Sequence, residues 1–343
     1  MKPLVSILIP AYNSDKLIAD TIRSAVAQTW ERKEIVIVDD GSTDRTLEVA
    51  RQFESDSVRI FQQKNQGAAA ARNKAFSLSR GDYIQWLDAD DLLSPDKIEL
   101  QMKLFEQEGS ERTLVSGPWG KFIYRYHRAH FEPTALWCDL APAEWLLRKI
   151  GQNLHMQTGT WLVTRKMTEE AGQWNTSLLG DDDGEYFCRV LLQSDGVRFV
   201  PEAKVYYRAT PNSLSYIGRS GKKVEAQWRS MQLHIQYLRS LEDTERVHAA
   251  CVRYLQNWLF HFYPERPDMV EQMQKTAGEL GGRLEIPRLS WKYSWIKSVF
   301  GPALAKRARI SLPRVKWSMV RFWDKTLFRL ENRRLQNLKG ADT

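Results

Sequence analysis

Val5-Ser-Ile-Leu-Ile9 and Glu34-Ile-Val-Ile-Val-Asp39 are short apolar runs that read as buried strands, and together with the segment between them they decide the fold class. Residues 16–28, between the two runs, carry apolar side chains at helical spacing: Leu17, Ile18, Ile22 and Val26. The pattern then repeats, with a helix predicted over 43–53, a strand over 58–61, a helix over 67–78 and a strand over 83–87. Such alternation predicts an α/β fold in which helices cover a mostly parallel sheet.

The rest of the chain is less regular. We expect strands over 121–128 and 158–164, helices over 143–150 and 185–192, and short strand-like pieces within 197–208. Residues from about 222 to 280 have helical patterns, and a basic, aromatic tail follows. These patterns divide the chain into an α/β domain over 1–215 with halves of about 1–118 and 119–215, a helical region over 216–285 and a tail over 286–343.

The formal net charge of +8 belongs to the tail. Residues 286–343 hold 14 Lys and Arg against 3 Asp and Glu, whereas residues 1–285 hold 36 against 39. The three cysteines lie far apart in the sequence, which is typical of a reducing compartment. The first apolar run is too short for a signal peptide, and no stretch reaches the roughly 18 apolar residues that span a bilayer. We therefore expect a cytoplasmic protein.

Three carboxylates follow the strand predicted over 83–87, at Asp88, Asp90 and Asp91. Ligands of parallel sheets bind beyond the carboxyl ends of the strands, and three like charges in one loop repel one another unless a cation lies among them. A hard divalent ion, Mn²⁺ or Mg²⁺, is bound by few carboxylates and takes its other ligands from phosphates and water. The alternative is an acidic helix start, because Ser94-Pro95-Asp96 begins the next helix. That alternative accounts for one acid but hardly for all three.

Two further polar segments follow a strand or open a helix. Val38-Asp39-Asp40-Gly41-Ser42-Thr43-Asp44 ends the second strand with paired aspartates, which suit recognition of a nucleoside through ring N–H groups or ribose hydroxyls. Asn65 through Asn73 opens a helix with small residues, and Arg72 lies one turn inside it, within reach of a diphosphate or of the acidic loops. A helix start explains part of each segment, but not the paired aspartates.

Four ordered motifs together resemble glycosyltransferase family 2: Val5 through Asn13, Val38 through Asp44, Gly67 through Asn73, and Asp88 through Asp91. The resemblance covers about residues 4–210. It implies a GT-A fold with a helical C-terminal extension, and a nucleoside-diphosphate sugar as donor, with a UDP-sugar favoured. It also implies a divalent metal and inversion at the anomeric carbon.

The same resemblance implies roles for particular residues. The first half of the α/β domain binds the nucleotide sugar and the second half binds the acceptor. Asp40 binds the base, Asp88 and Asp90 form an Asp-x-Asp pair at the ribose and the metal, and Asp91 shares the metal role. The nucleotide-binding residues implied in this way are Pro10, Ala11, Tyr12, Asp40, Arg72, Asp88 and Ala89.

The catalytic base is expected in the later acidic segment 180–189, which resembles the family motif in which an Asp precedes a helix that carries an Arg. Counting back from Arg189 places Asp183 at the base position, and Asp182 is the alternative because the family more often has Glu before that Asp. An inverting transfer needs one carboxylate to take the acceptor's proton, while the metal stabilises the departing diphosphate. An acidic helix start would account for Asp181 and Asp182.

Processive members of the family carry a Gln-x-x-Arg-Trp motif after this region. We find none in this sequence, which predicts a single addition per encounter. By analogy with surface polysaccharide or glycolipid assembly, the expected acceptor is a glycan or a lipid-linked saccharide.

The tail mixes aromatic with basic residues, as in Trp291-Lys-Tyr-Ser-Trp295. This composition is typical of an interfacial segment on an anionic membrane, and would hold the protein to the inner face of the cell membrane. Helices that pack on the catalytic domain are the alternative, and nucleic acid is not an expected partner.

Two other functions stay open at this point. A sugar-nucleotide pyrophosphorylase has a related fold but needs a Gly-rich loop bearing Arg and Lys after the first strand, where this chain has Pro10-Ala-Tyr-Asn13. A catalytically inactive relative that serves as a binding or assembly subunit is the non-enzyme alternative. Such a protein has no need to keep acids at Asp40, Asp88, Asp90 and Asp183.

Overall fold

The computed structural model of the chain describes residues 2–210, 221–286 and 317–331. The chain divides into two units: Met1–Lys121 with His130–Ala250, and Phe122–Ala129 with Cys251–Thr343. The first unit contains the sheets and most of the helices, and the second contains α-helical segments and a short connecting loop.

The first unit is built on a five-stranded sheet in the order β3-β2-β1-β4-β9. Its strands are β1 (Val5–Ala11), β2 (Lys33–Asp39), β3 (Val58–Gln62), β4 (Tyr83–Trp86) and β9 (Val163–Thr164). The first four are parallel, and β9 pairs antiparallel with β4. Side chains of β1 and β2 are buried on both faces of the sheet, which explains their unbroken apolar runs. The predicted α/β fold with a mostly parallel sheet is thus confirmed.

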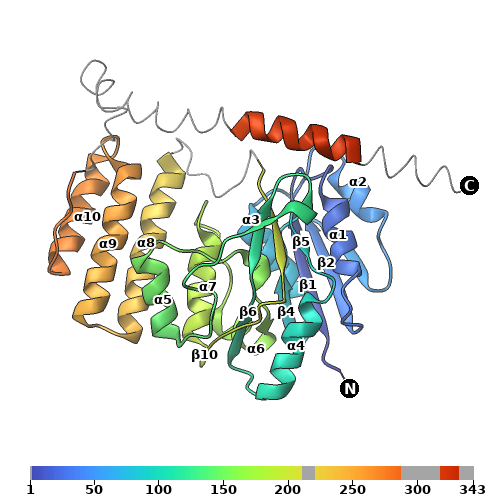
Figure 1. Ribbon diagram of the computed structural model, residues 1–343, viewed down its shortest axis with the longest axis horizontal. Coiled ribbons are helices and arrows are strands. Elements are labelled where there is room, and N and C mark those ends of the chain that lie inside the picture. Colours follow the sequence, from blue (N-terminus) through green and yellow to red (C-terminus); the bar gives the residue numbers. More distant parts are fainter. Residues whose placement is uncertain (1, 211–220, 287–316, 332–343) are drawn as a thin grey trace, which may run out of the picture. The chain divides into compact units, whose positions relative to one another are not determined.

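Three helices connect the parallel strands: α1 (Ile18–Val26), α2 (Thr46–Arg51) and α3 (Ala68–Leu78). The strand order runs outward from β1 to β3 and then returns to β4 on the other side of β1. Right-handed crossovers therefore place α1 and α2 on one face of the sheet and α3 on the other (Figure 1). The carboxyl ends of β1, β2 and β4 meet at one edge, where the polar motifs follow them.

Two smaller sheets complete the first unit, in the orders β10-β6 and β5-β11-β7-β8. Their strands are β5 (Leu92–Leu93), β6 (Thr113–Ser116), β7 (Trp119–Phe122), β8 (His130–Phe131), β10 (Gly196–Phe199) and β11 (Val205–Arg208). The helices of this part are α4 (Lys97–Glu108), α5 (Pro142–Gly151), α6 (Arg165–Ala171), α7 (Asp182–Leu192) and α8 (Gly221–Leu241). α8 belongs to the first unit and packs against α5 and α7.

Two of the predicted strands are wrong in extent. The strand expected over 121–128 ends at Phe122, and Tyr126–Arg128 form a 3-10 turn instead. The strand expected over 158–164 begins only at Val163, because Thr158–Thr160 form another 3-10 turn. The side-chain carbonyl of Gln157 accepts a hydrogen bond from the backbone N–H of Gly159 at the start of that turn, and such local bonds compete with strand pairing.

Tryptophans of the first unit gather in an aromatic core behind α7. Trp174 stacks on Tyr186 with ring centroids 4.1 Å apart and 9° between the ring planes, and Trp86 meets both rings edge-on. Trp161 continues the cluster through Phe187. Aromatic pairs of this kind add to the stabilisation that comes from buried apolar area, and they give the start of α7 a rigid support.

The second unit contains most of α9 (Glu245–Phe262), all of α10 (Pro267–Glu279), the loop 122–129 and a helix over 317–331. Apolar residues of α9 and α10, such as Leu255, Leu259 and Met273, are fully or almost fully buried. In the described part of the chain, no helix is both long and apolar enough to cross a membrane. The tail segments 287–316 and 332–343, which include Trp291 and Trp295, lie outside the described residues.

Candidate active site

Arg72 joins two acidic loops that are far apart in the sequence. Its Nη2 donates to Oδ1 of Asp88 at 2.7 Å, and its Nη1 donates to Oδ2 of Asp182 at 2.8 Å. The arginine is 5% exposed, and its guanidinium carbon lies 4.3 Å from the centroid of the Trp174 ring. The structure therefore places Arg72 among the acidic loops, which is one of the two roles that the sequence leaves open.

The charge of Arg72 is secured by these contacts. Burial acts to lower its pKa, but the neighbouring carboxylates of Asp88 and Asp182 outweigh burial and raise the pKa above its ordinary value. The guanidinium is therefore cationic throughout the working pH range. Because its planar fork meets one carboxylate with each terminal nitrogen, a lysine would not reproduce this geometry.

Asp91 turns away from the edge of the sheet and into the protein. It is fully buried, and its Oδ1 accepts a hydrogen bond from the backbone N–H of Arg208 at 2.8 Å. Its Oδ2 accepts from the side-chain amide of Gln157. Burial, with the charges of Asp90 and Asp88, raises the pKa of Asp91 well above its ordinary value. These contacts make Asp91 the residue that ties the acidic loop to β11.

Asp88 and Asp90 remain nearer the open edge. Oδ1 of Asp88 accepts a hydrogen bond from Arg72, and Oδ2 of Asp88 lies 3.4 Å from the side-chain amide of Gln157. Burial, followed by the charge of Asp88, raises the pKa of Asp90 to about 6. A raised pKa of this origin means that the carboxylate lacks sufficient positive charge nearby.

The residues present fit a divalent ion with few protein ligands. Across residues 2–210, 221–286 and 317–331, no three His, Cys, Asp or Glu side chains are arranged to hold a metal ion. Asp91 is committed to Gln157 and Arg208, so the three acids expected as one ligand set do not converge. Asp88 and Asp90 offer only oxygen donors, and Mg²⁺ typically binds one or two carboxylates together with substrate phosphates.

The start of α7 presents three consecutive aspartates with three different environments. Asp181 adopts a left-handed backbone conformation with φ of 56°, which Asp tolerates better than most residues. Asp182 forms the ion pair with Arg72. Oδ2 of Asp183 lies 3.5 Å from the hydroxyl of Thr158. Burial, with the charges of Asp182 and Asp181, raises the pKa of Asp183 to about 7.

Helix α8 supports this acidic turn from behind. The hydroxyl of Ser230 donates to Oδ2 of Asp181 at 2.6 Å, and the amide of Gln227 lies 3.3 Å from the same oxygen. Burial alone would raise the pKa of Asp181, but His234, Lys149 and these hydrogen bonds outweigh it, so the pKa is lowered. Asp181 is therefore an ionised anchor for the backbone that carries Asp182 and Asp183.

Replacing Ser230 with alanine is expected to reduce the free energy of unfolding by about 1.5–3 kcal/mol, the range for a hydrogen bond to a charged group. Urea denaturation measures the change. Ser240→Ala on the same helix is the matched control, because the exposed Ser240 hydroxyl bonds only the carbonyl of Tyr237 and its loss should leave the midpoint unchanged. Equal midpoints for Ser230→Ala and Ser240→Ala would show that the anchor does not stabilise the fold.

At the end of β2, Asp40 holds the loop that precedes α3. Its Oδ1 accepts from the amide of Gln63 and the backbone N–H of Gln66, and its Oδ2 accepts from the backbone N–H of Gly67. Gly67 has φ of 92°, a conformation that favours glycine. A carboxylate has about four acceptor positions, so these three bonds leave about one for a ligand.

The other residues predicted at the nucleotide lie along the same edge of the sheet. Pro10 and Ala11 are buried at the end of β1, whereas the Tyr12 side chain is 49% exposed. Ala89 is nearly buried, and its carbonyl accepts from the hydroxyl of Thr21. The structure thus brings Arg72, Asp88 and Asp182 into direct contact, while Asp40 and Tyr12 stand at the neighbouring strand ends.

Several residues at the site carry no recognisable sequence signal. Gln157 bonds Asp91 and approaches Asp88, and Trp174 lies beneath Arg72. Ser230 comes from a helix almost fifty residues beyond the acidic turn that it supports. A single glutamine, tryptophan or serine has no spacing pattern, so only the fold reveals these roles.

The chain is similar to known glycosyltransferases in its first half. Residues 6–168 match the family described as Glycosyl transferase family 2. The chain is 46% identical over 108 residues to a chondroitin synthase of Escherichia coli, across 31% of this chain and 16% of the synthase. It is 43% identical over 105 residues to the putative teichuronic acid biosynthesis glycosyltransferase TuaG of Bacillus subtilis, across 30% of this chain and 42% of that protein. These alignments span less than half the length of either relative.

Solved structures resemble the chain over a longer range. TarS of S. aureus, residues 1–349 in complex with UDP-GlcNAc, has a TM-score of 0.65 at 18% identity, across 82% of this chain and 81% of that one. The same protein in complex with UDP has a TM-score of 0.60. At this identity the likeness concerns the fold, which is a GT-A fold with a helical C-terminal region. With its family motifs at the ends of β1, β2 and β4 and at the start of α3, the chain contains, in residues 6–168, a match to the domain described as Glycosyl transferase family 2.

Proposed function

We propose that this protein is an inverting glycosyltransferase that moves a sugar from a nucleoside-diphosphate sugar onto an acceptor hydroxyl. The observation that carries the proposal is the arrangement of Asp183 beside the Asp182–Arg72–Asp88 chain of ion pairs. One carboxylate there has a pKa of about 7, and its neighbours are held in place by a buried arginine. A general base works best when its pKa lies near the operating pH.

Asp183 is the proposed base. It accepts the proton of the acceptor hydroxyl as that oxygen forms a bond to the anomeric carbon, while the bond from this carbon to the diphosphate oxygen breaks. Attack from the face opposite the leaving group inverts the anomeric centre. Asp182 suits this role less, because its carboxylate is paired with Arg72.

Asp88 and Asp90 are the proposed protein ligands of Mn²⁺ or Mg²⁺, and Asp91 orients their loop through Gln157 and Arg208. The ion, when bound, neutralises charge on the diphosphate leaving group. Arg72 holds Asp88 at one terminal nitrogen and Asp182 at the other, so the metal side and the base side of the site keep a fixed separation.

A UDP-sugar is the proposed donor. TarS has been solved with UDP and with UDP-GlcNAc, and it shares the fold. Tyr12 offers an exposed ring on which a base can stack, and Asp40 keeps about one acceptor position for a ring N–H. Pro10, Ala11 and Ala89 are proposed to line the nucleotide pocket beside Tyr12 and Asp40.

The proposed acceptor is a glycan or a lipid-linked saccharide, extended by one sugar per encounter. The matched relatives include proteins named for chondroitin and for teichuronic acid biosynthesis, which supports a role in surface polysaccharide assembly. The missing Gln-x-x-Arg-Trp motif supports single addition.

The donor and the metal are tested together. UDP-, GDP- and dTDP-sugars are incubated with the full chain with and without Mn²⁺, and release of the nucleotide is measured. We expect turnover of a UDP-sugar that EDTA abolishes and Mn²⁺ restores. Asp90→Asn should raise the Mn²⁺ concentration for half-maximal activity by at least about 10–100-fold. Loss of a residue that only supports a metal ligand already lowers metal affinity by this factor, and Asp90 is a proposed direct ligand.

Asp56→Asn is the matched control, because Asp56 is exposed on the turn before β3, and its metal response should equal that of the natural chain. Activity that survives EDTA, or an Asp90→Asn variant with an unchanged metal response, would remove the metal from the proposal. Absence of turnover with every donor would favour an inactive relative that serves as a binding subunit.

A further inference from the structure

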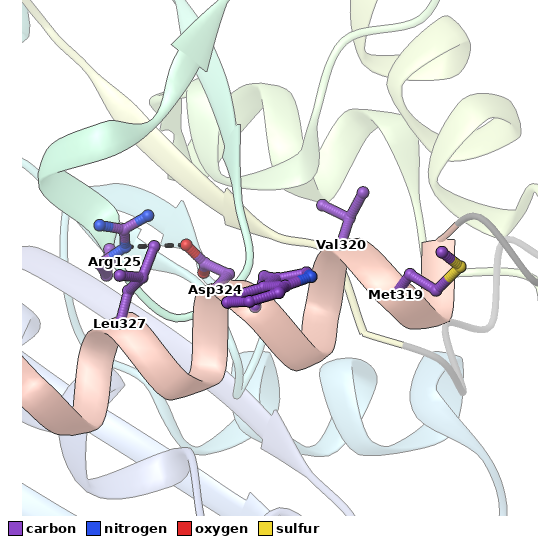
Figure 2. Close-up of a pocket in the computed structure, with 6 residues that line it drawn as sticks. Arg125, Met319, Val320, Asp324 and Leu327 are labelled. Carbon is purple, nitrogen blue, oxygen red and sulfur yellow. Dashed lines mark hydrogen bonds and ion pairs between the residues drawn. The ribbon is translucent and has the colours of Figure 1, made fainter.

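The helix over 317–331 is fixed in rotation by an ion-pair cluster with the loop 122–129. Nε of Arg125 contacts Oδ1 of Asp324 at 2.8 Å, and its Nη1 contacts Oε1 of Glu331 at 2.9 Å. The backbone N–H of Tyr124 donates to Oδ2 of Asp324 at 3.0 Å. The side chains of Arg125 and Asp324 are each 16% exposed. Figure 2 shows this ion pair at one side of the helix.

A different face of the same helix is apolar and open. Its residues recur at i, i+1, i+4, i+8 and i+11, which places them on one stripe of an α-helix. They are between 40% and 64% exposed: Met319, Val320, Trp323, Leu327 and Leu330. A hollow of about 410 Å³ lies along this stripe, lined by Met319, Val320, Trp323 and Leu327 with Arg125 and Asp324 at its side (Figure 2). Contiguous exposed apolar surface of this kind marks an interaction site.

The charged residues of the helix, and of the sequence around it, indicate which kind of surface the stripe binds. Arg321, Lys325 and Arg329 recur at i, i+4 and i+8, and the helical repeat places them as a basic face on the side of the helix opposite the stripe. The two acids of the helix, Asp324 and Glu331, are both paired with Arg125. In the sequence on either side, residues 287–316 and 332–343 hold 11 Lys and Arg against one Asp. The helix therefore combines an apolar stripe with a basic opposite face and two acids that share one arginine.

We propose that the helix over 317–331 docks on an anionic lipid surface and lies in the plane of the membrane interface. Its stripe would enter the boundary between headgroups and acyl chains, while the long side chains of the basic face reach toward lipid phosphates. Arg125 holds the helix by its two acids and leaves the neighbouring apolar stripe exposed. This inference is independent of the sugar-transfer chemistry, because none of these residues belongs to the candidate active site.

The test uses the full chain and two kinds of vesicle, phosphatidylcholine alone and equal parts phosphatidylcholine and phosphatidylglycerol. Co-sedimentation should show binding to the anionic vesicles that weakens as salt is added, and little binding to the neutral ones. The double variant Trp323→Ala with Leu327→Ala should bind anionic vesicles at least about tenfold more weakly, given the transfer free energy of two such side chains. Arg321→Gln with Arg329→Gln should also weaken binding and flatten its salt dependence.

The matched control is Val26→Ala with Leu241→Ala, which removes exposed apolar side chains elsewhere and should leave vesicle binding unchanged. Melting temperatures establish that every variant is folded. Vesicle binding by the Trp323 and Leu327 variant equal to that of the natural chain would overturn the proposal. So would a concentration-dependent dimer of the natural chain that this variant abolishes, because the stripe would then be a contact between two copies.

Discussion

Replacing Asp183 with asparagine is expected to lower kcat by about 10²- to 10⁴-fold, the contribution of a positioned general base. The amide keeps the size of the carboxylate but cannot accept the acceptor's proton. Donor affinity should change little, because the proposed donor contacts lie at Asp88, Asp90 and the strand ends. Nucleotide release at saturating donor and acceptor measures kcat, and Asp56→Asn serves as the control on an exposed carboxylate.

The pH dependence of activity tests the same carboxylate, that of Asp183. Because burial and the neighbouring aspartates raise the pKa of Asp183 to about 7, activity of the natural chain should fall as the pH decreases through about 7. The residual activity of Asp183→Asn should lack this limb. A variant that keeps its activity within tenfold of the natural chain would place the base elsewhere.

Measurements of stability distinguish a folded variant that lacks the base from a variant that is unfolded. The folded-state pKa of Asp183, about 7, lies above its ordinary value of 3.8, so between these pH values the folded state binds more protons than the unfolded state. The stability that Asp183 contributes therefore declines as the pH rises from about 4 to about 7. Asp183→Asn removes this loss, and its melting temperature at pH 8 should equal or exceed that of the natural chain.

Asp182→Asn tests the ion pair with Arg72 instead of the base, although burial raises the pKa of Asp182 as well. Asp182 is paired with Arg72 at 2.8 Å, so its replacement weakens a buried ion pair and should lower the melting temperature. If Asp182→Asn were the variant that lost activity without losing stability, the two roles would have to be exchanged.

Replacing Arg72 with methionine is expected to lower the free energy of unfolding by about 3–5 kcal/mol, the range for breaking a buried ion pair on one side. Methionine keeps an unbranched apolar side chain, but it removes the guanidinium that lies over Trp174 and leaves Asp88 and Asp182 without their common cation. Urea denaturation at neutral pH measures the difference. Activity should fall as well, since both carboxylates lose their fixed positions.

The stability difference between Arg72→Met and the natural chain should depend on pH. At acid pH the uncompensated carboxylates take up protons, so the difference between Arg72→Met and the natural chain should shrink as the pH decreases. Arg45→Met is the matched control, because it breaks a bidentate ion pair with Glu48 at the surface and should leave the midpoint unchanged. An Arg72→Met variant as stable as the natural chain would contradict the buried position of this arginine.

Local patterns in the sequence predict much of the first half of the fold. The apolar runs at Val5–Ala11 and Lys33–Asp39 are buried on both faces of a parallel sheet, and such strands have a recognisable composition. The acids that follow β2 and β4 stand at the predicted edge. Prediction is poorer beyond Phe122, where the strands are short and a side chain such as Gln157 changes the local structure.

The sequence by itself determined that carboxylates gather where strands end, because strand periodicity and chain order are local properties. It did not determine which carboxylate does what. Asp88, Asp90 and Asp91 are equivalent in the sequence, yet Asp91 is buried against Gln157 and Arg208 while Asp88 pairs with Arg72. Those contacts join residues 16 to 117 positions apart. Only tertiary packing decides burial and charge pairing over such separations, and these two quantities set the pKa of each acid.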